Sequence, residues 1–416
     1  MDINRLYDLF TQSCGVTTDS RKVGKDEIFF ALRGESFDGN RFAVQALKDG
    51  AAYAVIDSAE VTDGAGEYSE RLILVDNTLV ALQELARKHR LELAIPIIGI
   101  VGSNGKTTTK ELVNCVLSQK FTTYATKGNL NNHIGVPLTL LSMDSTTEIG
   151  IVEMGASAQK EIELLCSISQ PNYGIITNIG NAHLEGFGGK EGIIKGKGEL
   201  YDYLNTVGGR AFVPAEDSTL SSMAQERTNM ATERYSRALA EGYKSQLSGD
   251  YNRYNIAAAV AIGQYFDIEQ SRIAEAIESY TPQNNRSQEM TTKRSNLLII
   301  DCYNANPSSM EAAIGNIASK SGEEKLLILG DMLELGEWSL EEHCRILNLA
   351  VQVQDAELLL VGREFLRAAH ALGIDVTCCA DSAEAAEYIE QSQINNTTVL
   401  LKGSRGIALE KLIDKL

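Results

Sequence analysis

A short run of small and polar residues, Gly-Ser-Asn-Gly-Lys-Thr-Thr at positions 102–108, has the composition of a phosphate-binding loop. Glycines let backbone N–H groups approach an anion without a Cβ in the way, and a following helix adds the partial positive charge of its N-terminus. In such a loop Lys106 reaches the β- and γ-phosphates of a nucleotide, and the Thr107 hydroxyl is a ligand for Mg²⁺. The predicted nucleotide-binding residues are Gly102, Ser103, Asn104, Gly105, Lys106, Thr107 and Thr108.

The loop departs from the strict P-loop pattern, which places a glycine five residues before Gly105, where this chain has Ile100. The alternative is an ordinary glycine-rich turn with an incidental lysine. The surrounding pattern favours phosphate binding, because an apolar β-branched run at 97–101 predicts a buried parallel strand and residues 108–119 predict a helix.

Two further strand ends carry residue types that bind metal ions. A strand predicted at 148–152 ends at Glu153, and a strand predicted at 173–177 leads into a polar segment that contains His183. In an open parallel sheet these ends lie on the edge that binds ligands, so Glu153 suits a Mg²⁺ ligand and His183 a second one. A lone histidine is more often structural. The nearby Lys195 and Lys197, in a glycine-rich segment, read from composition alone as an exposed basic turn.

Composition narrows the class of protein. The chain has 416 residues, of which 44% are hydrophobic and 23% charged, as in soluble proteins of two or three domains. The net charge of −18 argues against a nucleic-acid partner. There is no long apolar run and no signal-peptide pattern, so we expect no membrane span and a cytoplasmic location. Seven scattered cysteines without a Cys-x-x-Cys pair indicate reduced thiols.

The alternation of apolar runs and helical patterns predicts an α/β fold of three domains. We expect a smaller N-terminal α/β domain at 1–93, a central P-loop-type ATPase domain with a parallel sheet at 94–282, and a C-terminal Rossmann-like domain at 283–416. The last boundary is placed after Pro282, which ends the preceding helix.

Several individual elements can be placed from these patterns. In the first domain we expect strands at 27–32, 51–57 and 71–75 and helices at 41–49 and 78–89. In the third we expect strands at 297–300, 325–329, 357–361 and 398–402, and helices at 308–319, 340–353, 363–372, 382–391 and 407–413. No Gly-x-Gly-x-x-Gly turn is present, so a dinucleotide is not indicated. From the residues alone the chain is a Mg-ATP enzyme, and kinase, hydrolase and ligase chemistry all remain open.

Longer stretches resemble the Mur ligases. They are Thr-Asp-Ser-Arg at 18–21, Gly-Asn-Leu-Asn-Asn-His-Ile-Gly-Val-Pro at 128–137, Glu-Met-Gly-Ala at 153–156, Thr-Asn-Ile-Gly-Asn-Ala-His at 177–183, Lys-Gly-Lys-Gly-Glu at 195–199, Asp-Cys-Tyr-Asn-Ala-Asn-Pro at 301–307 and Leu-Gly-Asp-Met-Leu-Glu-Leu-Gly at 329–336, together with the phosphate loop. They occur in the family's order over essentially the whole chain. Those at 128–137, 301–307 and 329–336 narrow the resemblance to the members that add D-alanyl-D-alanine.

The resemblance implies an ATP-dependent amide ligase that joins D-alanyl-D-alanine to UDP-N-acetylmuramoyl-tripeptide. The reaction would pass through an acyl phosphate, release ADP and phosphate, and give the UDP-MurNAc-pentapeptide precursor of peptidoglycan. ATP and Mg²⁺ are the implied cofactors, both carbon substrates are small molecules, and a monomer is expected.

The resemblance also implies roles for individual residues. The catalytic residues would be Lys106, Glu153, His183 and Lys197, and the metal ligands Thr107, Glu153 and His183. Further nucleotide contacts would come from Asn255, Arg286, Asp301 and Tyr303. The muramoyl-tripeptide would meet Ser20, Arg21, Asn129, Asn131 and Asn132, and the dipeptide Asn304, Asp331 and Met332. In sister Mur ligases a lysine here is carbamylated, which points to Lys197, with Lys195 as the alternative.

Two positions depart from the family pattern. Before the adenine-side helix many relatives carry Gly-x-His-Asn, where this chain has Gly-Asp-Tyr-Asn at 249–252. After Phe37-Asp38-Gly39 relatives often carry histidine, where this chain has Asn40. Two other functions are also compatible with parts of the sequence. One is a sister ligase, such as a folylpolyglutamate synthase or the enzyme that adds the third muropeptide residue. The other is a nucleotide-dependent switch with weak turnover.

Overall fold

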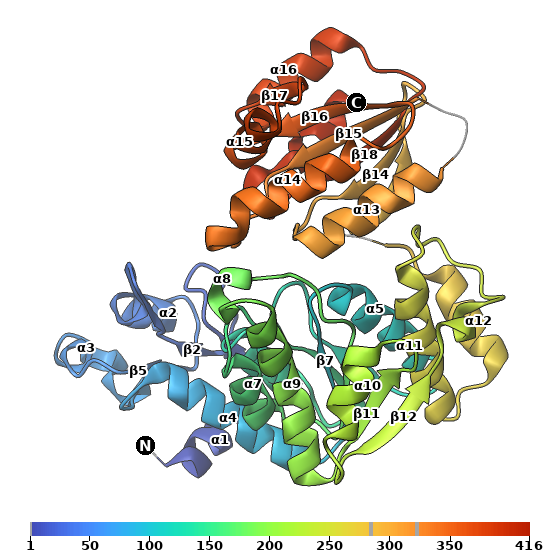
Figure 1. The fold of residues 1–416 in the computed structure, drawn as a ribbon. Coiled ribbons are helices and arrows are strands. Elements are labelled where there is room, and N and C mark those ends of the chain that lie inside the picture. Colours follow the sequence, from blue (N-terminus) through green and yellow to red (C-terminus); the bar gives the residue numbers. More distant parts are fainter. Residues whose placement is uncertain (1, 283–285, 321–323) are drawn as a thin grey trace.

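Three large sheets, each with its own covering helices, follow one another along the chain (Figure 1). The computed structural model describes residues 2–282, 286–320 and 324–416. Each sheet falls within one of the predicted segments 1–93, 94–282 and 283–416. The predicted start of the third segment, 283–285, lies outside the described residues. The predicted α/β fold class with a central parallel sheet is confirmed.

The N-terminal sheet has four parallel strands in the order β1-β2-β5-β6. Its strands are β1 (Val16–Thr17), β2 (Ile28–Phe30), β5 (Tyr53–Ile56) and β6 (Leu72–Leu74), and a separate hairpin is formed by β3 (Arg33–Gly34) and β4 (Phe37–Asp38). The helices are α1 (Ile3–Thr11), α2 (Ala43–Lys48), α3 (Glu60–Asp63) and α4 (Thr78–Leu93), with 3-10 turns η1 (Gly39–Phe42) and η2 (Gly66–Arg71). As expected for a helix start, the Asn77 side chain caps α4 by accepting from the Val80 N–H.

The helix predicted at 41–49 is split in two, because the chain first forms the 3-10 turn η1 and only then α2. Asn40 explains the turn. Its side chain is 2% exposed, donates to Asp38 and Asp57, and accepts from the Asp57 N–H. These bonds hold the chain in a tight turn before the helix can start. Asn40 is therefore a structural residue of this domain.

The central sheet has six parallel strands in the order β12-β11-β10-β7-β9-β8. They are β7 (Ile97–Val101), β8 (Thr123–Ala125), β9 (Ile149–Glu153), β10 (Tyr173–Ile176), β11 (Arg210–Pro214) and β12 (Ala231–Tyr235). The helices are α5 (Lys106–Leu117), α6 (Gly135–Leu141), α7 (Glu161–Ser169), α8 (Leu184–Phe187), α9 (Lys190–Val207), α10 (Ser218–Gln225), α11 (Asn252–Tyr265) and α12 (Gln270–Ser279), with the 3-10 turn η3 (Arg237–Ala240). Strand β7 is buried throughout, as its apolar sequence predicts.

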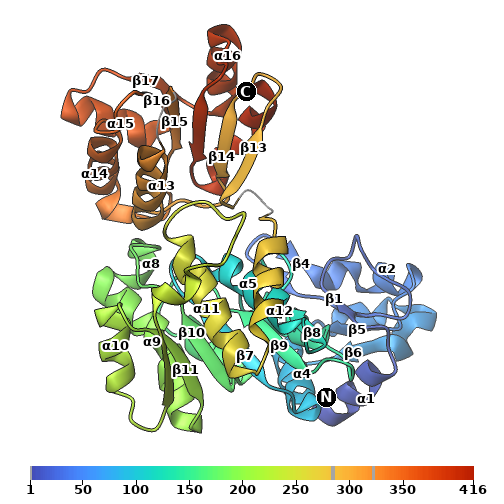
Figure 2. The same ribbon diagram turned by 90° about the vertical axis from the view of Figure 1, so that its right-hand side faces the viewer.

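Helices cover both faces of the central sheet (Figure 2). Helices α5, α11 and α12 bury one face in a common apolar core, and α6, α7 and α9 bury the other. The N-terminal domain joins the second core, because Leu82 and Leu85 of α4 pack in the same cluster as Ile162 of α7. Shared apolar burial therefore fixes the first domain to the central one.

The C-terminal sheet runs in the order β13-β14-β18-β15-β16-β17, and only β13 is antiparallel to its neighbour. The strands are β13 (Gln288–Thr291), β14 (Leu297–Asp301), β15 (Lys325–Gly330), β16 (Ala356–Val361), β17 (Thr377–Cys379) and β18 (Thr398–Lys402). The helices are α13 (Pro307–Ser319), α14 (Ser339–Ala350), α15 (Arg363–Leu372) and α16 (Ser382–Ser392), and the 3-10 turn η4 (Gly336–Trp338) precedes α14.

The α-helix predicted at 407–413 is wrong in type. The chain ends in two 3-10 segments, η5 (Arg405–Ile407) and η6 (Leu409–Lys415). Ala408 lies between them with φ 58°, and this left-handed residue interrupts any continuous right-handed helix. Among the described residues, no helix is both long and apolar enough to cross a membrane.

Candidate active site

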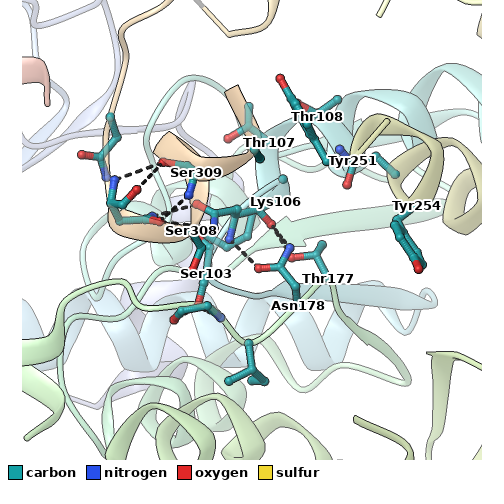
Figure 3. Close-up of a pocket in the computed structure, with 18 of the residues that line it drawn as sticks. Ser103, Lys106, Thr107, Thr108, Thr177, Asn178, Tyr251, Tyr254, Ser308 and Ser309 are labelled. Atoms are coloured by element: carbon teal, nitrogen blue, oxygen red, sulfur yellow. Dashed lines mark hydrogen bonds between the residues drawn. The ribbon is translucent and has the colours of Figure 1, made fainter. Parts of the chain in front are cut away.

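A cavity of about 1370 Å³ lies between the central and C-terminal domains. Strand ends and helix starts from both domains line it (Figure 3). The predicted site residues in its lining are Ser103, Asn104, Gly105, Lys106, Thr107, Thr108, Asn131, Asn132, Glu153, His183, Asn255, Arg286, Asp301, Tyr303 and Asn304. Residues 200 positions apart in the sequence are thus brought to one place.

The phosphate loop joins β7 to α5 and needs glycine at two points. Gly102 and Gly105 have φ angles of 146° and 76°. A Cβ on Gly102 would collide with the Thr177 side chain, and one on Gly105 would lie 2.6 Å from Asn255 Oδ1. Gly102 itself is outside the cavity lining, where its carbonyl accepts a 2.7 Å hydrogen bond from Lys106 Nζ. The glycines therefore serve close packing of the loop on its neighbours.

Lys106 lies at the first position of α5, where the helix N-terminus adds its own positive potential. Burial lowers the pKa of Lys106, and the Glu153 carboxylate opposes that shift. An amine that lines a cavity beside a helix N-terminus is placed to receive an anion with several phosphate groups.

Glu153 ends β9 and is 1% exposed. Its Oε2 accepts a 2.9 Å hydrogen bond from Thr107 Oγ1, and its Oε1 accepts one of 2.8 Å from Asn131 Nδ2. The ammonium of the buried Lys110 lies 4.0 Å from Oε2. A hydroxyl and a carboxylate held side by side are the hard oxygen donors that Mg²⁺ prefers, and Mg²⁺ needs few protein ligands beyond these. The residues present therefore fit the predicted ion.

His183 lies apart from this pair. It adopts φ 56°, and its Nδ1 forms an ion pair with Glu334 of the C-terminal domain. The hydrogen bond from His183 lowers the pKa of Glu334. Within the described ranges, no three His, Cys, Asp or Glu side chains are grouped so as to hold a metal. The structure thus brings Thr107 and Glu153 together, and it engages His183 in a contact between domains.

The sequence offered Lys197 and Lys195 as candidates, and in the structure Lys197 is buried whereas Lys195 is exposed. Lys197 is 1% exposed within α9, its Nζ donates to Ala156 O at 2.9 Å, and it lies 4.7 Å from the centre of the Phe187 ring. Burial and the positive charge of Lys106 lower its pKa well below the ordinary value. Lys195 is exposed on the same helix. The interpretation of 195–199 as an exposed turn is wrong, since the segment is helical.

The C-terminal domain contributes a cluster of charge to the cavity. The Arg286 guanidinium lies 3.8 Å from the centre of the Tyr303 ring. Lys402, 2% exposed at the end of β18, forms a 2.8 Å ion pair with Asp301 and donates to Asn304 O. Lys402 was not among the predicted site residues. The sequence feature that could have indicated Lys402 is its position at the end of a predicted strand, since the neighbouring strands also end in polar residues.

Other predicted residues lie outside the cavity lining: Gly102, Lys197, Ser20, Arg21, Asn129, Asp331 and Met332. Arg21 is in the N-terminal domain, with its side chain 84% exposed and paired with Asp19. Met332 is buried, and its N–H donates to His343 Nε2.

Asp331 does not fit the predicted contact with a dipeptide. The residue is 4% exposed, and its two carboxylate oxygens accept the N–H groups of Glu364 and Phe365 at 3.0 and 2.9 Å. These are free N–H groups of the first turn of α15, so the carboxylate caps that helix. Its place after a strand end made it resemble a ligand residue, but its side chain turns into the domain.

Replacing Asp331 by alanine is accordingly expected to lower the free energy of unfolding by about 2–4 kcal/mol, because two buried N–H groups lose a charged acceptor. Urea unfolding of the whole chain measures this loss. Asp375→Ala, at an exposed position of the same domain, is the control. A variant with unchanged stability but a raised KM for the dipeptide would restore the original interpretation.

At the family departure before the adenine-side helix, both Asp250 and Tyr251 have partners. Asp250 pairs with Arg237 at 2.6 Å, and the Tyr251 hydroxyl is 2.7 Å from Ser287 Oγ. Tyr251 also lines the cavity, and burial raises its pKa. Tyr251, Arg286 and Ser287 therefore lie together in the cavity lining.

Comparison with known proteins agrees with this arrangement along the whole chain. Residues 14–90 match the Mur ligase family catalytic domain, 100–241 the Mur ligase middle domain, and 285–405 the Mur ligase glutamate ligase domain. The UDP-N-acetylmuramoyl-tripeptide–D-alanyl-D-alanine ligase of Bacillus subtilis is 33% identical, with 97% of this chain and 93% of that protein covered. The chain belongs to the Mur ligase family. The corresponding Escherichia coli ligase is 32% identical over 96% of this chain and 93% of its own length.

Solved Mur ligase structures superpose on all three domains. A MurF structure from Acinetobacter baumannii has a TM-score of 0.86 at 28% identity and covers 99% of this chain and 98% of its own. A MurF structure from Thermotoga maritima in complex with ADP has a TM-score of 0.83 at 25% identity, covering 98% and 97%. A folylpolyglutamate synthase from Mycobacterium tuberculosis shares only the fold, with a TM-score of 0.62 and 15% identity over 79% of this chain and 92% of its own.

Proposed function

We propose that this Mur ligase joins D-alanyl-D-alanine to UDP-N-acetylmuramoyl-tripeptide at the expense of ATP, giving the pentapeptide precursor of peptidoglycan. Relatives more than 30% identical over nearly the whole chain carry that activity in their names. The supporting observation in the structure is the single cavity that joins the phosphate loop to the strand ends of the C-terminal domain. We also propose that the enzyme acts as a monomer.

The chemistry requires two anions to meet. The tripeptide carboxylate attacks the γ-phosphorus of ATP, the bond to ADP breaks, and an acyl phosphate forms. The amine of D-alanyl-D-alanine then attacks the acyl carbon, loses a proton, and expels phosphate. A loose phosphoryl transfer needs mainly positioning and neutralisation of charge, and the protein provides both through Lys106 and the N-terminus of α5.

Thr107 and Glu153 are proposed to hold Mg²⁺, and the side-chain amide of Asn131 keeps the Glu153 carboxylate oriented through its 2.8 Å hydrogen bond. When bound, the ion would neutralise phosphate oxygens and align them for in-line attack. We further propose His183 as a ligand of a second ion, which requires it to release Glu334 first.

Lys197 is proposed to carry a carbamate. Its amine adds to CO₂, forming an N–C bond and releasing one proton, and only the neutral amine reacts. A lysine with a strongly lowered pKa supplies that neutral form. The Nζ lies against Ala156 O, and Ala156 itself lines the cavity, so the new anionic group would form at the cavity wall. Lys195 is exposed to solvent and does not line the cavity.

The remaining substrate contacts stay proposals. Asn255, Arg286, Asp301 and Tyr303 are proposed for the nucleotide, and Asn304 for the dipeptide. Ser20, Arg21, Asn129, Asn131 and Asn132 are proposed for the muramoyl-tripeptide. Of the last group, only Asn131 and Asn132 line the cavity.

The deciding experiment measures phosphate release with ATP, Mg²⁺, UDP-MurNAc-tripeptide and D-alanyl-D-alanine, omitting each in turn. Release that needs all four, with a UDP-pentapeptide identified by mass, supports the proposal. Release with another amine in place of the dipeptide would favour a sister ligase. Slow release from ATP and Mg²⁺ alone would favour a nucleotide-dependent switch.

Glu153→Gln tests the metal assignment. The amide keeps the volume and the hydrogen bond from Thr107 but removes the negative charge, so we expect the Mg²⁺ concentration for half-maximal rate to rise roughly 10-fold or more. Titrating phosphate release with Mg²⁺ measures it. Glu148→Gln, at the start of the same strand region, is the control and should titrate as wild type. An unchanged Mg²⁺ midpoint for Glu153→Gln would remove Glu153 from the metal site.

A further inference from the structure

A pair of side-chain amides joins the phosphate loop to the C-terminal domain. Asn306 Nδ2 donates to Asn104 Oδ1 at 2.7 Å, and Asn104 Nδ2 lies 3.4 Å from Asn306 Oδ1 in the reverse direction. The two residues are 202 positions apart in the sequence. Both line the cavity, so this contact crosses between domains at the place where the nucleotide phosphates are expected.

On the central-domain side, the backbone of Asn104 is fixed. Its N–H donates to Asn178 Oδ1 at 3.1 Å, and its carbonyl accepts from Asn178 Nδ2 at 3.0 Å and from Thr177 Oγ1 at 2.5 Å. Figure 3 shows Thr177 and Asn178 beside the loop with these bonds drawn. Because both the N–H and the carbonyl of Asn104 are hydrogen-bonded, its side chain cannot move without the phosphate loop. A group that binds this side chain is therefore held in a fixed position relative to the loop.

On the C-terminal side, Asn306 starts helix α13. Its Oδ1 accepts from the Ser309 N–H at 3.0 Å and its own N–H donates to Ser309 Oγ at 3.0 Å, which together form a capping box. The next residue but one, Ser308, accepts the Asn181 N–H on its Oγ at 2.9 Å. The amide of Asn306 is therefore both the cap of α13 and the group that holds this helix end against the loop.

We propose that Asn306 is a positioning residue for ligation, which couples the phosphate loop to the placement of the C-terminal domain through Asn104. This inference rests on the proposed function. The acyl phosphate is safe from hydrolysis only while the two domains exclude water, and the amide pair holds them together beside that intermediate. An amide pair suits the position because it gives directional hydrogen bonds and adds no charge next to the phosphates.

Asn306→Ser separates this role from helix capping. Serine is as good an N-cap as asparagine, but its side chain is too short to reach Asn104. The assay measures phosphate and UDP-pentapeptide in the same reaction. We expect kcat to fall roughly 10- to 100-fold, in line with the cost of small misplacements. We also expect the ratio of phosphate to pentapeptide to rise from one to about two or more, since an open site lets water compete.

Two further variants make the result specific. In the double variant N104S/N306S the losses should not add, because both changes remove the same contact. Asn316→Ala removes a different bond between the domains, from the same helix α13 to Ser248 Oγ at 2.9 Å, and should leave the phosphate-to-pentapeptide ratio at one. Thermal unfolding confirms that each variant is folded.

Three results would overturn the inference. Asn306→Ser could form pentapeptide at the wild-type rate with a ratio of one. The losses of Asn104→Ser and Asn306→Ser could add. Asn316→Ala could raise the ratio as much as Asn306→Ser. In each case the wild-type enzyme still makes pentapeptide, so the proposed function stands. If the wild-type protein makes no pentapeptide, the proposed function is wrong, and the inference that rests on it is wrong too.

Discussion

Lys106→Ala is expected to lower kcat for phosphate release about 100- to 1000-fold, because one charged group lost from a preorganised anion site costs about 3–4 kcal/mol. Lys106 lies at the N-terminus of α5 and lines the cavity, so its ammonium and the helix N-terminus act on the same anion. The buried Lys110 is not placed to replace it, since its Nζ is engaged with Thr126 O and Glu111. The rate is measured with all four reactants at saturation.

The matched control is Lys120→Ala, which removes an exposed amine just beyond α5 that donates to the backbone carbonyls of Phe266 and Asp267 and lies over the Phe121 ring, outside the cavity lining. It should keep the wild-type rate. Lys106→Arg should also fail, because a planar guanidinium cannot take the compact place of an ammonium in a closed loop. If Lys106→Ala kept more than a tenth of the wild-type rate, the glycine-rich turn would be the ordinary turn that Ile100 first suggested.

The phosphate loop could be predicted because its chemistry lies within consecutive residues. Gly102 to Thr107 carry glycine, lysine and hydroxyl in the order that a strand, a turn and a helix require. Ile100, the apparent defect, lies within the buried strand β7, and the tight turn begins only at Gly102, where φ is 146°. Glu153 was predictable for a similar reason, since it ends a fully buried strand.

Side-chain direction was harder to predict. Asp301 ends the apolar strand β14 and Asp331 follows β15, but Asp301 lines the cavity with Lys402, whereas Asp331 turns to cap α15. Sequence patterns place the Cα atom at a sheet edge and leave open which neighbour takes the carboxylate. That neighbour lies 33 and 34 positions further along the chain, in a helix start whose free N–H groups have no local signature.

The segment 195–199 shows how glycine can mislead. Gly-rich composition suggested a turn, but Gly196 and Gly198 lie inside α9. A Cβ on Gly196 would collide with the Phe187 ring, so glycine is required there by packing and not by a turn. Lys195 and Lys197, two residues apart on a helix, point to different sides, which buries one and exposes the other. Contacts between domains, such as that of Asn104 with Asn306, leave no pattern in the sequence at all.

Lys197→Met is expected to lower kcat by about 100- to 1000-fold, since it removes the group proposed to become an anion at the cavity wall. Methionine keeps most of the volume of the buried side chain, so the packing against Phe187 is preserved. In ¹³C-bicarbonate the wild type should show a carbamate carbon by NMR, Lys195→Met should keep that signal, and Lys197→Met should lose it. A signal that followed Lys195 would reverse the assignment.

The buried amine of Lys197 should also make the free energy of unfolding depend on pH. Its folded pKa lies well below the ordinary value of 10.5, so between the two the unfolded chain binds the proton and the folded chain does not. The free energy of unfolding should therefore rise with pH between these two pKa values, by up to about 1.4 kcal/mol per pH unit from this one group. The same contribution is lost as the pH falls through this range. In CO₂-free buffer Lys197→Met should lack this component while being catalytically weak. A gain in stability at neutral pH together with a loss of activity would show that Lys197 is buried at a cost to folding that the reaction, and not packing, requires.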